Sequence, residues 1–558
     1  MKNFRISTLL TCLFLLTLSA FGQTEGNGKP DPNFHIYLCF GQSNMQGKGT
    51  IEDQDKQDVP ERFKMMAAVD FTALNRKSGE WYTAVPPLCR PETALCPADY
   101  FGRELVKNLP DSIKVGVINV AVDGCGIEMY DEDVCQGYIK GQPSYMTSAA
   151  AAYDNNPFRR LVDLGKKAQE SGVIKGILIH QGETNMGNEK WGIYVNRIYL
   201  RMLNELGLQA SEVPLIAGEM LRSEFGGVCA NHIPAVDRLP KLIPNCMVAT
   251  SENCKGGDQY HFNSAGYRTL GRRYAKLMLK YLESYQTTSQ VEASSVRFED
   301  ENIEMLPATW RKFHVIATDA EGKETDVTSA CQYEVADPDL VSVEGNKLVS
   351  GQKTGQTTLT ARFADVAGKE FTLTIPVAIT LLQLEGSTFN ASMYLDATFT
   401  QSPGSYVFKS TTNAFGGWVF QQGLDISGTP YVMCEFNSKP SSYSKIYVYD
   451  QPDYMAPRFY KNINTGREVT IDLRTLKDSN GKDLDLQHVH FLGLCLGTNP
   501  TLNIKSVSLS ADGENPVGIQ PLTATDQTDR TCYDLQGRRV DPRSNGFYIR
   551  NNKKLYIK

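Results

Sequence analysis

The stretch that decides the fold is His35-Ile-Tyr-Leu-Cys-Phe40, which is followed at once by Gly41-Gln-Ser-Asn-Met45. A short apolar run that ends at a glycine predicts a buried strand and then a tight turn. The residues after Ser43 are compatible with a helix, so this serine is accessible to substrate and lies in the field of a helix N-terminus. Ser43 is therefore a candidate nucleophile, with a helix N-cap as the ordinary alternative. The turn is not the Gly-x-Ser-x-Gly nucleophile elbow of the α/β-hydrolases, because Met45 occupies the position of the second glycine.

The alternation of apolar strands and amphipathic helices continues from about residue 33 to residue 285. The candidate strands are Ile36–Phe40, Val115–Ala121, Gly176–His180, Val213–Gly218 and Met247–Ser251, and the candidate helices include Phe158–Ser171, Tyr194–Gly207 and Ser264–Tyr285. This spacing predicts a parallel sheet wrapped by helices, in which the functional residues lie on loops at the carboxyl ends of the strands. Ser43, Gly124 and Gln181 each follow a predicted strand, as such a site requires.

A second short string, Asp258-Gln-Tyr-His261, places a carboxylate three residues before an imidazole. On a loop or a first helical turn, Asp258 reaches Nδ1 of His261, fixes its tautomer and stabilises the imidazolium that forms when Ser43 loses its proton. An aspartate N-cap beside an incidental surface histidine is the competing interpretation. Together the three side chains predict acyl transfer through a serine ester.

Two further strings follow predicted strands. The flexible backbone of Ala121-Val-Asp-Gly-Cys-Gly-Ile127 can direct an amide at an oxyanion, and His180-Gln-Gly-Glu-Thr-Asn185 places polar side chains after an apolar run. An oxyanion hole needs fixed donors of this kind, each worth roughly 3 kcal/mol in the transition state. A glycine turn and a polar loop cap are the ordinary alternatives, but four polar strings at four strand ends favour one shared site.

These strings resemble those of the SGNH (GDSL-like) hydrolase superfamily, and within it the sialate O-acetylesterase and carbohydrate esterase family six group. The resemblance covers about residues 33–285 and rests on Gly41-Gln-Ser-Asn44, the glycine block at Gly124, His180-Gln-Gly-Glu183 and Asp258-x-x-His261. It implies an α/β/α hydrolase domain with a flavodoxin-like parallel sheet.

The resemblance also implies residue roles. Ser43 would be the nucleophile, His261 the base and Asp258 the residue that orients it. The Ser43 amide, the Gly124 amide and the Gln181 side chain would form the oxyanion hole. Supporting positions would be held by Gln42, Asn44 and Glu183, the last of which is also a fallback carboxylate.

The glycine block departs from the family. It reads Asp123-Gly-Cys125 where the family usually has Gly-Gly-Thr/Ser, so the Gly124 donor is kept while the pocket lining changes. We expect an exported serine esterase that removes O-acetyl groups from a carbohydrate such as acetylxylan and requires no metal or organic cofactor. The alternatives are a sialate O-acetylesterase acting on host glycans, a catalytically inactive surface glycan-binding protein, and, ranked lower, a lipase or thioesterase.

The chain changes character after residue 285. A polar linker, Gln286–Gln290, precedes strict alternation such as Phe371-Thr-Leu-Thr-Ile375, which predicts β-sandwich strands. Trp418, in the later aromatic-rich stretch, is a possible sugar-stacking residue, with sandwich core as the commoner alternative. The expected division is a signal peptide at 1–22, an SGNH hydrolase domain at 30–287, an Ig-like β-sandwich at 291–380, a carbohydrate-binding-like jelly roll at 381–512 and a sorting-signal-like tail module at 516–558.

Composition limits the partners and the location. With a net charge of −6 over 558 residues, the chain suits a neutral polymer better than nucleic acid or an anionic membrane. A basic start followed by the apolar run Leu9–Leu18 predicts export, to the periplasm or the cell surface. Of thirteen cysteines, the pairs Cys89/Cys96 and Cys246/Cys254 are close enough in sequence for disulfides, and no zinc-type spacing occurs.

Overall fold

The computed structural model describes residues 30–283 and 291–513, except for residues 387, 392, 394–396, 412, 442, 454–457 and 498–499, together with four short strands of the tail. The predicted signal peptide at 1–22, the linker Gln286–Gln290 and most of the predicted tail module at 516–558 lie outside the described residues. None of the helices in the described stretches combines the length and apolar character needed to cross a membrane.

The first domain is built on one seven-stranded sheet with the order β3-β2-β4-β1-β5-β6-β7. Its strands are β1 Phe34–Gly41, β2 Phe63–Met66, β3 Trp81–Thr83, β4 Lys114–Ala121, β5 Val173–His180, β6 Leu215–Gly218 and β7 Cys246–Ala249. All neighbouring pairs are parallel except β2 and β3, which run antiparallel at one edge. The predicted parallel sheet is confirmed, and the short edge pair β2–β3 was not predicted.

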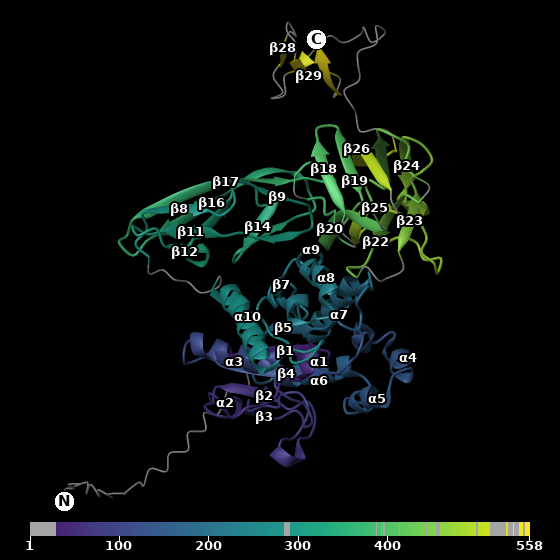
Figure 1. Cartoon of the computed structure of the whole chain (residues 1–558). Coiled ribbons are helices and arrows are strands. Elements are labelled where there is room, and N and C mark those ends of the chain that lie inside the picture. Colours follow the sequence, from purple (N-terminus) through teal and green to yellow (C-terminus); the bar gives the residue numbers. More distant parts are fainter. Residues whose placement is uncertain are drawn as a thin grey trace, which may run out of the picture.

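Helices cover both faces of this sheet (Figure 1). They are α1 Ser43–Gln46, α2 Asp53–Lys56, α3 Pro97–Asn108, α4 Cys135–Lys140, α5 Ser144–Ala151, α6 Pro157–Gln169, α7 Trp191–Leu206, α8 Ile233–Asp237, α9 Leu239–Leu242 and α10 Ser264–Glu283. The alternation of side chains along β1 explains the two layers. Ile36 and Leu38 point into the core formed with α6 and α7, whereas Tyr37 points into the core formed with α3 and α10.

The next unit is all-β. Its strands are β8 Ser295–Phe298, β9 Ile303–Met305, β10 Trp310–Lys312, β11 Val315–Thr318, β12 Glu324–Asp326, β13 Gln332–Val335, β14 Val341–Glu344, β15 Lys347–Ser350, β16 Gly355–Ala364 and β17 Glu370–Ile379. The alternation predicted around Phe371–Ile375 lies in β17, which pairs with β16 over ten residues. Leu359 and Ile375 face the core of this sandwich.

A second sandwich follows, with a five-stranded sheet β18-β19-β26-β21-β24 and a four-stranded sheet β20-β25-β22-β23. Its strands are β18 Thr398–Ser402, β19 Ser405–Lys409, β20 Ala414–Leu424, β21 Tyr431–Phe436, β22 Lys445–Tyr449, β23 Phe459–Asn462, β24 Glu468–Asp472, β25 Val489–Leu496 and β26 Thr501–Ser510. The tail strands are β27 Cys532–Tyr533, β28 Arg539–Val540, β29 Gly546–Arg550 and β30 Lys553–Ile557. We propose that the boundaries predicted at 30–287, 291–380 and 381–512 separate these units.

Trp418 is a core residue of the second sandwich. Its side chain is 0% exposed and its ring lies 5.1 Å from that of Phe389. The indole N–H donates to the carbonyl oxygen of Gln383 at 3.1 Å. The predicted sugar-stacking role is therefore wrong, because a sugar cannot reach a ring enclosed between two sheets.

The eleven cysteines from Cys39 to Cys495 are all free thiols, so the pairings considered for Cys89/Cys96 and Cys246/Cys254 do not form. The thiols of Cys89 and Cys246 contact oxygen atoms instead of other thiols. The sulfur of Cys89 lies 3.3 Å from the hydroxyl of Tyr153, and burial raises the pKa of both Cys89 and Cys246. These side chains behave as small apolar core residues.

The second sandwich packs directly on the first domain, beside α7, α8 and α9 (Figure 1). Five of its side chains belong to the same buried cluster as α6 and α7, namely Met393, Phe415, Tyr447, Tyr449 and Phe491. A hydrogen bond from Asn390 Nδ2 to the carbonyl oxygen of Lys241, at 2.6 Å, joins the same two units. The apolar core is thus continuous across the boundary.

Candidate active site

The register of the sheet brings three of the predicted strings to one edge. In the central strand, Gly41 is paired with Ala121 of β4 on one side and with His180 of β5 on the other. Parallel strands that end in register place the loops that follow them side by side. Ser43 and Gln181 therefore emerge next to each other, and the glycine block begins at the neighbouring position.

The structure joins Ser43 to the Asp258-x-x-His261 string, 218 residues further along the chain. The hydroxyl oxygen of Ser43 lies 2.9 Å from Nε2 of His261. On the other side of the ring, Nδ1 of His261 lies 2.8 Å from Oδ2 of Asp258. A nucleophile, a base and an orienting carboxylate are thus connected in the order that acyl transfer needs.

Backbone N–H groups of its own turn hold the Asp258 carboxylate in place. Its Oδ1 accepts the backbone N–H groups of Tyr260 at 2.7 Å and of His261 at 2.8 Å, while Oδ2 faces the imidazole. Partial burial pushes the pKa of Asp258 upward, but these hydrogen bonds to the charged form outweigh it and hold the pKa below its usual value. The carboxylate therefore stays ionised wherever the imidazole needs an acceptor at Nδ1.

Asn44 ties the nucleophile to the loop that carries the base. Its Nδ2 donates to the carbonyl oxygen of Tyr260 at 3.0 Å and to Oε1 of Glu183 at 2.6 Å. Its Oδ1 accepts the hydroxyl of Tyr267 at 2.6 Å. Because Asn44 and Ser43 are neighbours, and so are Tyr260 and His261, this fully buried amide fixes the separation of the two reacting groups.

Glu183 lies behind this amide and does not form part of the Ser–His–Asp chain. Its Oε1 lies 3.4 Å from Nε2 of His180, an electrostatic contact whose geometry does not make a hydrogen bond. Burial raises the pKa of Glu183, but the neighbouring His180 and the Asn44 amide more than offset this and leave the pKa below its usual value. Its position is that of a support for Asn44.

Glu219 is a structural residue of the site that the sequence reasoning missed. It follows β6 and accepts the backbone N–H of Ser251 at 2.8 Å and the hydroxyl of Thr250 at 3.1 Å. Arg222 caps the same carboxylate at 2.8 Å. These contacts bind the loop after β6 to the loop after β7, which leads to Asp258. Its place directly after the predicted strand Val213–Gly218 was the available signal.

Two of the three predicted oxyanion donors are open. The backbone amides of Ser43 and Gly124 have no acceptor among the described residues. Gly124 has a φ of +66°, and a Cβ there would lie 2.7 Å from the hydroxyl of Tyr145. Only glycine therefore suits this position, and its N–H is free to point at a ligand.

The third predicted donor, Gln181, is already occupied. Its Nε2 faces Oδ1 of Asn185 at 2.6 Å, Oε1 of Gln42 at 3.1 Å and the carbonyl oxygen of Cys125 at 3.2 Å. An amide nitrogen carries two hydrogens, so three internal acceptors leave none for an oxyanion. The structure therefore contradicts the direct role predicted for Gln181.

In Gln42 the side-chain oxygen is occupied and the side-chain nitrogen is free of partners among the described residues. Its Oε1 accepts from Nε2 of Gln181 and from the backbone amides of Gly182 and Thr184, the latter two at 3.3 Å. This fixes which end of the amide is oxygen. Its Nε2 has no acceptor in the part of the chain that the structure describes. This nitrogen belongs to the residue next to Ser43 in the chain and is a donor without a partner among the described residues.

No cluster of three or more His, Cys, Asp or Glu side chains placed to hold a metal ion occurs among the described residues. The groups that the site brings together are a serine hydroxyl, an imidazole held by a carboxylate, and N–H donors without acceptors among the described residues.

Comparisons with known proteins match the part of the chain that carries this site. Residues 33–280 match the family model described as carbohydrate esterase, sialic acid-specific acetylesterase. All the site residues described above fall within that match.

Solved structures similar to this chain include a protein from Arabidopsis thaliana, with 19% identity over 45% of this chain and 99% of that chain and a TM-score of 0.33. NanS has 16% identity over 46% of this chain and 98% of its own, with a TM-score of 0.34. A carbohydrate acetylesterase from Xanthomonas citri has 14% identity over 62% of this chain and 79% of that chain, with a TM-score of 0.33. The match to the family described as carbohydrate esterase, sialic acid-specific acetylesterase thus covers residues 33–280, which form the first domain and make up less than half of the chain.

Proposed function

We propose that this protein hydrolyses O-acetyl esters of an oligo- or polysaccharide through an acetyl-serine intermediate. The observation that carries the proposal is the contact of Ser43 Oγ with His261 Nε2 at 2.9 Å, with Asp258 on the opposite ring nitrogen. A serine is a weak nucleophile at its free pKa and needs a base within hydrogen-bond distance. This site supplies that base.

The reaction proceeds in two halves. Ser43 attacks the acetyl carbonyl carbon while His261 accepts the hydroxyl proton, and the carbonyl oxygen takes the negative charge of the tetrahedral intermediate. His261 then gives its proton to the sugar oxygen as the ester bond breaks, which leaves acetyl-Ser43. In the second half His261 deprotonates a water molecule, which attacks the acetyl group and releases acetate and free Ser43.

The tetrahedral oxyanion would be held by the backbone amides of Ser43 and Gly124 and by Nε2 of Gln42. All three donors lack acceptors among the described residues, so none has to break a bond before it binds the developing charge. Gln181 would act as a positioning residue, since its amide nitrogen holds the oxygen end of Gln42.

A neutral acetylated sugar, such as the xylose of acetylxylan, is the substrate that the charges beside the site favour. Lys48 follows the nucleophile helix and Asp123 precedes the Gly124 donor, and the two form an ion pair at 2.5 Å. A cation neutralised in this way offers little to the carboxylate of sialic acid. We further propose that the chain is exported to the periplasm or the cell surface, where such polymers occur, by the segment predicted at 1–22.

The test is acetate release from acetylated xylan and from O-acetylated sialic acid, with Ser43→Ala as the matched control. Release from xylan that is absent in Ser43→Ala supports both the chemistry and the substrate class. Release from the sialic acid alone would overturn the substrate proposal and keep the chemistry. No release from either, with 4-nitrophenyl acetate also untouched, would overturn the esterase proposal and favour a glycan-binding role.

A further inference from the structure

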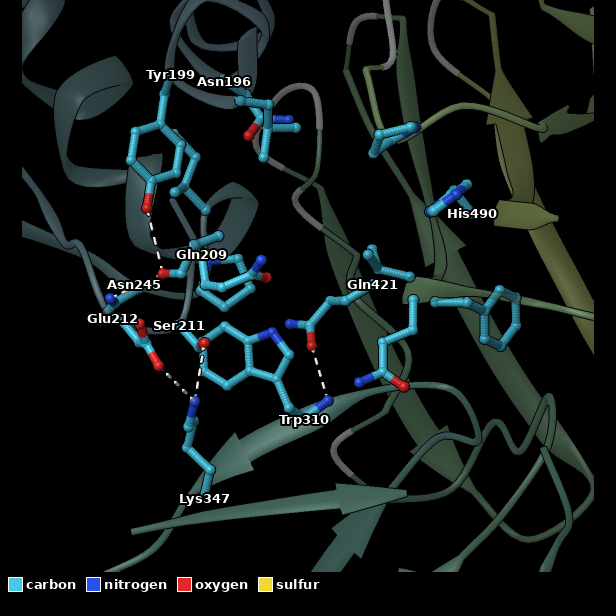
Figure 2. Close-up of a pocket in the computed structure, with 18 of the residues that line it drawn as sticks. Asn196, Tyr199, Gln209, Ser211, Glu212, Asn245, Trp310, Lys347, Gln421 and His490 are labelled. Atoms are coloured by element: carbon cyan, nitrogen blue, oxygen red, sulfur yellow. Dashed lines mark hydrogen bonds and ion pairs between the residues drawn. The ribbon is translucent and has the colours of Figure 1, made fainter. Parts of the chain in front are cut away.

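A cavity of about 330 Å³ lies where the esterase domain meets both sandwiches (Figure 2). Its walls come from α7 and the segments before β6 and β7, from β10 and β15 of the first sandwich, and from β20 of the second. The volume lies in the range of about 300–1,000 Å³ that is typical of small-molecule sites.

This cavity is separate from the serine site. The loops 209–212 and 242–245 precede β6 and β7, whereas Ser43, Gly124 and Gln181 follow β1, β4 and β5. The two sites therefore lie at opposite ends of the parallel sheet. The strand β6 has four residues, and at roughly 3.3 Å per residue the loop before it lies about 13 Å from the loop after it. One sugar ring cannot occupy both sites.

An aromatic ring forms one wall of the cavity. Trp310 is half-buried, and its backbone N–H is fixed by Oε1 of Gln421 at 2.9 Å. Its indole N–H makes no hydrogen bond with any described residue. Figure 2 shows the indole extending from β10 towards Gln209 and Ser211 of the esterase domain. The ring thus presents both an apolar face and a free donor.

Amides without partners supply the polar groups. Asn196 of α7 is only 5% exposed, yet its side-chain amide forms no hydrogen bond with the described residues. An amide in this state bonds to water unless a ligand takes its place. The amides of Gln209 and Gln422 line the same space and are likewise unpaired within the described chain.

The buried lysine of the cavity is compensated by its neighbours. Lys347 is almost completely buried, and its Nζ lies 3.0 Å from the hydroxyl of Ser211 and 3.9 Å from a carboxylate oxygen of Glu212. The lysine is therefore compensated and does not select for an anion. Apart from the exposed carboxylate of Glu344, what is left for a ligand is neutral: an aromatic face and amides that each offer a donor and an acceptor.

We propose that this cavity binds a neutral pyranose unit of an oligosaccharide. The apolar face of such a ring lies against the Trp310 indole, and its hydroxyls exchange hydrogen bonds with the amides of Asn196, Gln209 and Gln422. The choice of ligand rests on the proposed function, since a deacetylase of polysaccharides gains from holding the chain at a second point. The binding itself does not depend on Ser43.

The test is calorimetric titration of the full chain carrying Ser43→Ala with xylohexaose, cellohexaose and mannohexaose. We expect at least one of these unacetylated sugars to bind. Trp310→Ala, made in the same background, should then weaken binding by about tenfold or more, since truncated tryptophans dominate such contacts. Asn196→Ala should weaken it by about threefold to tenfold.

Two further variants separate local folding effects from binding. Trp310→Phe keeps an aromatic face and should retain more affinity than Trp310→Ala. Tyr443→Ala removes an aromatic that is 69% exposed on the second sandwich, outside the cavity, and should leave binding unchanged. The proposal is overturned if no probe binds, if Trp310→Ala and Asn196→Ala bind as tightly as the parent, or if Tyr443→Ala has the larger effect. Acetate release by the unsubstituted chain is measured separately, so either proposal can fail alone.

Discussion

The chain contains two Asp-x-x-His turns of nearly the same geometry, and only one belongs to a site. In the esterase domain, Nδ1 of His261 lies 2.8 Å from Oδ2 of Asp258. In the second sandwich, Nδ1 of His488 lies 2.9 Å from Oδ2 of Asp485. In both turns Oδ1 of the aspartate accepts the backbone N–H two residues later. The short string therefore builds an oriented imidazole wherever it occurs.

What differs is the other side of the ring. Nε2 of His261 faces the Ser43 hydroxyl, and the His261 side chain is 19% exposed. The His488 side chain is 62% exposed, and no described residue takes its Nε2. A carboxylate orients a base in both turns, and the catalytic role proposed for His261 depends on the sheet register, which delivers Ser43 to the same place.

The largest difference is expected between the two histidines. His261→Gln removes the base, so deacetylation should fall by at least about 10³-fold, as loss of a triad histidine does elsewhere. His488→Gln is the matched control and should stay within about twofold of the parent. The measurement is initial-rate acetate release. A comparable loss in both variants would show that the contrast is wrong.

The aspartates come next. Asp258→Asn keeps the size but loses the acceptor that sets the tautomer of His261, so kcat should fall by about 10²- to 10⁴-fold. Asp485→Asn should have no effect on rate. Glu183→Gln should cost less than Asp258→Asn, because Glu183 contacts Asn44 instead of the imidazole. If Glu183→Gln proved the more damaging, Glu183 would be the orienting carboxylate.

A smaller effect is expected at the oxyanion donors. Gln42→Ala removes the open amide nitrogen and should lower kcat by about 10²-fold with little change in KM. Gln181→Ala should cost only about tenfold, because the backbone amides of Gly182 and Thr184 still hold Gln42. Single-turnover kinetics separate the two. The opposite order would return the donor role to Gln181.

The smallest effect concerns protonation. The His488 side chain and the Gln487 backbone N–H hold the pKa of Asp485 below its usual value. For Asp258, partial burial works against its hydrogen bonds, and the bonds prevail. A depressed pKa means that each pair stabilises the fold above the unfolded value near 3.9 and loses this as the pH falls through the folded value. His488→Gln should raise the pKa of Asp485 in a carboxyl NMR titration and leave that of Asp258 unchanged. An unmoved Asp485 would contradict this account.

The sequence was most informative where a functional group sits in a short string at a strand end. Ser43, Asp258 and His261 could be predicted because each is marked by its immediate neighbours and by the strand before it. Gln181 was misassigned since the hydrogen bonds of a side chain depend on residues that pack around it, here Gln42 and Asn185.

The two tryptophans of the β units show the same limit. Trp418 and Trp310 both lie in or at the start of sandwich strands, yet one is enclosed between sheets and the other lines a cavity. Local sequence cannot distinguish these outcomes, because the burial of a strand residue is decided by which sheet or domain covers it. The residues that line the cavity come from three units of the chain, so no single short sequence motif marks them.

The hydrophobic cluster that runs from the esterase helices into the second sandwich has a consequence for how the chain can be divided. A chain ending at residue 283 would uncover the apolar surface that Phe415, Tyr447 and Phe491 now cover in the cluster they share with the esterase domain. We therefore expect the two units to unfold together as one cooperative block. An esterase domain moved to another protein would need the second sandwich to be included with it.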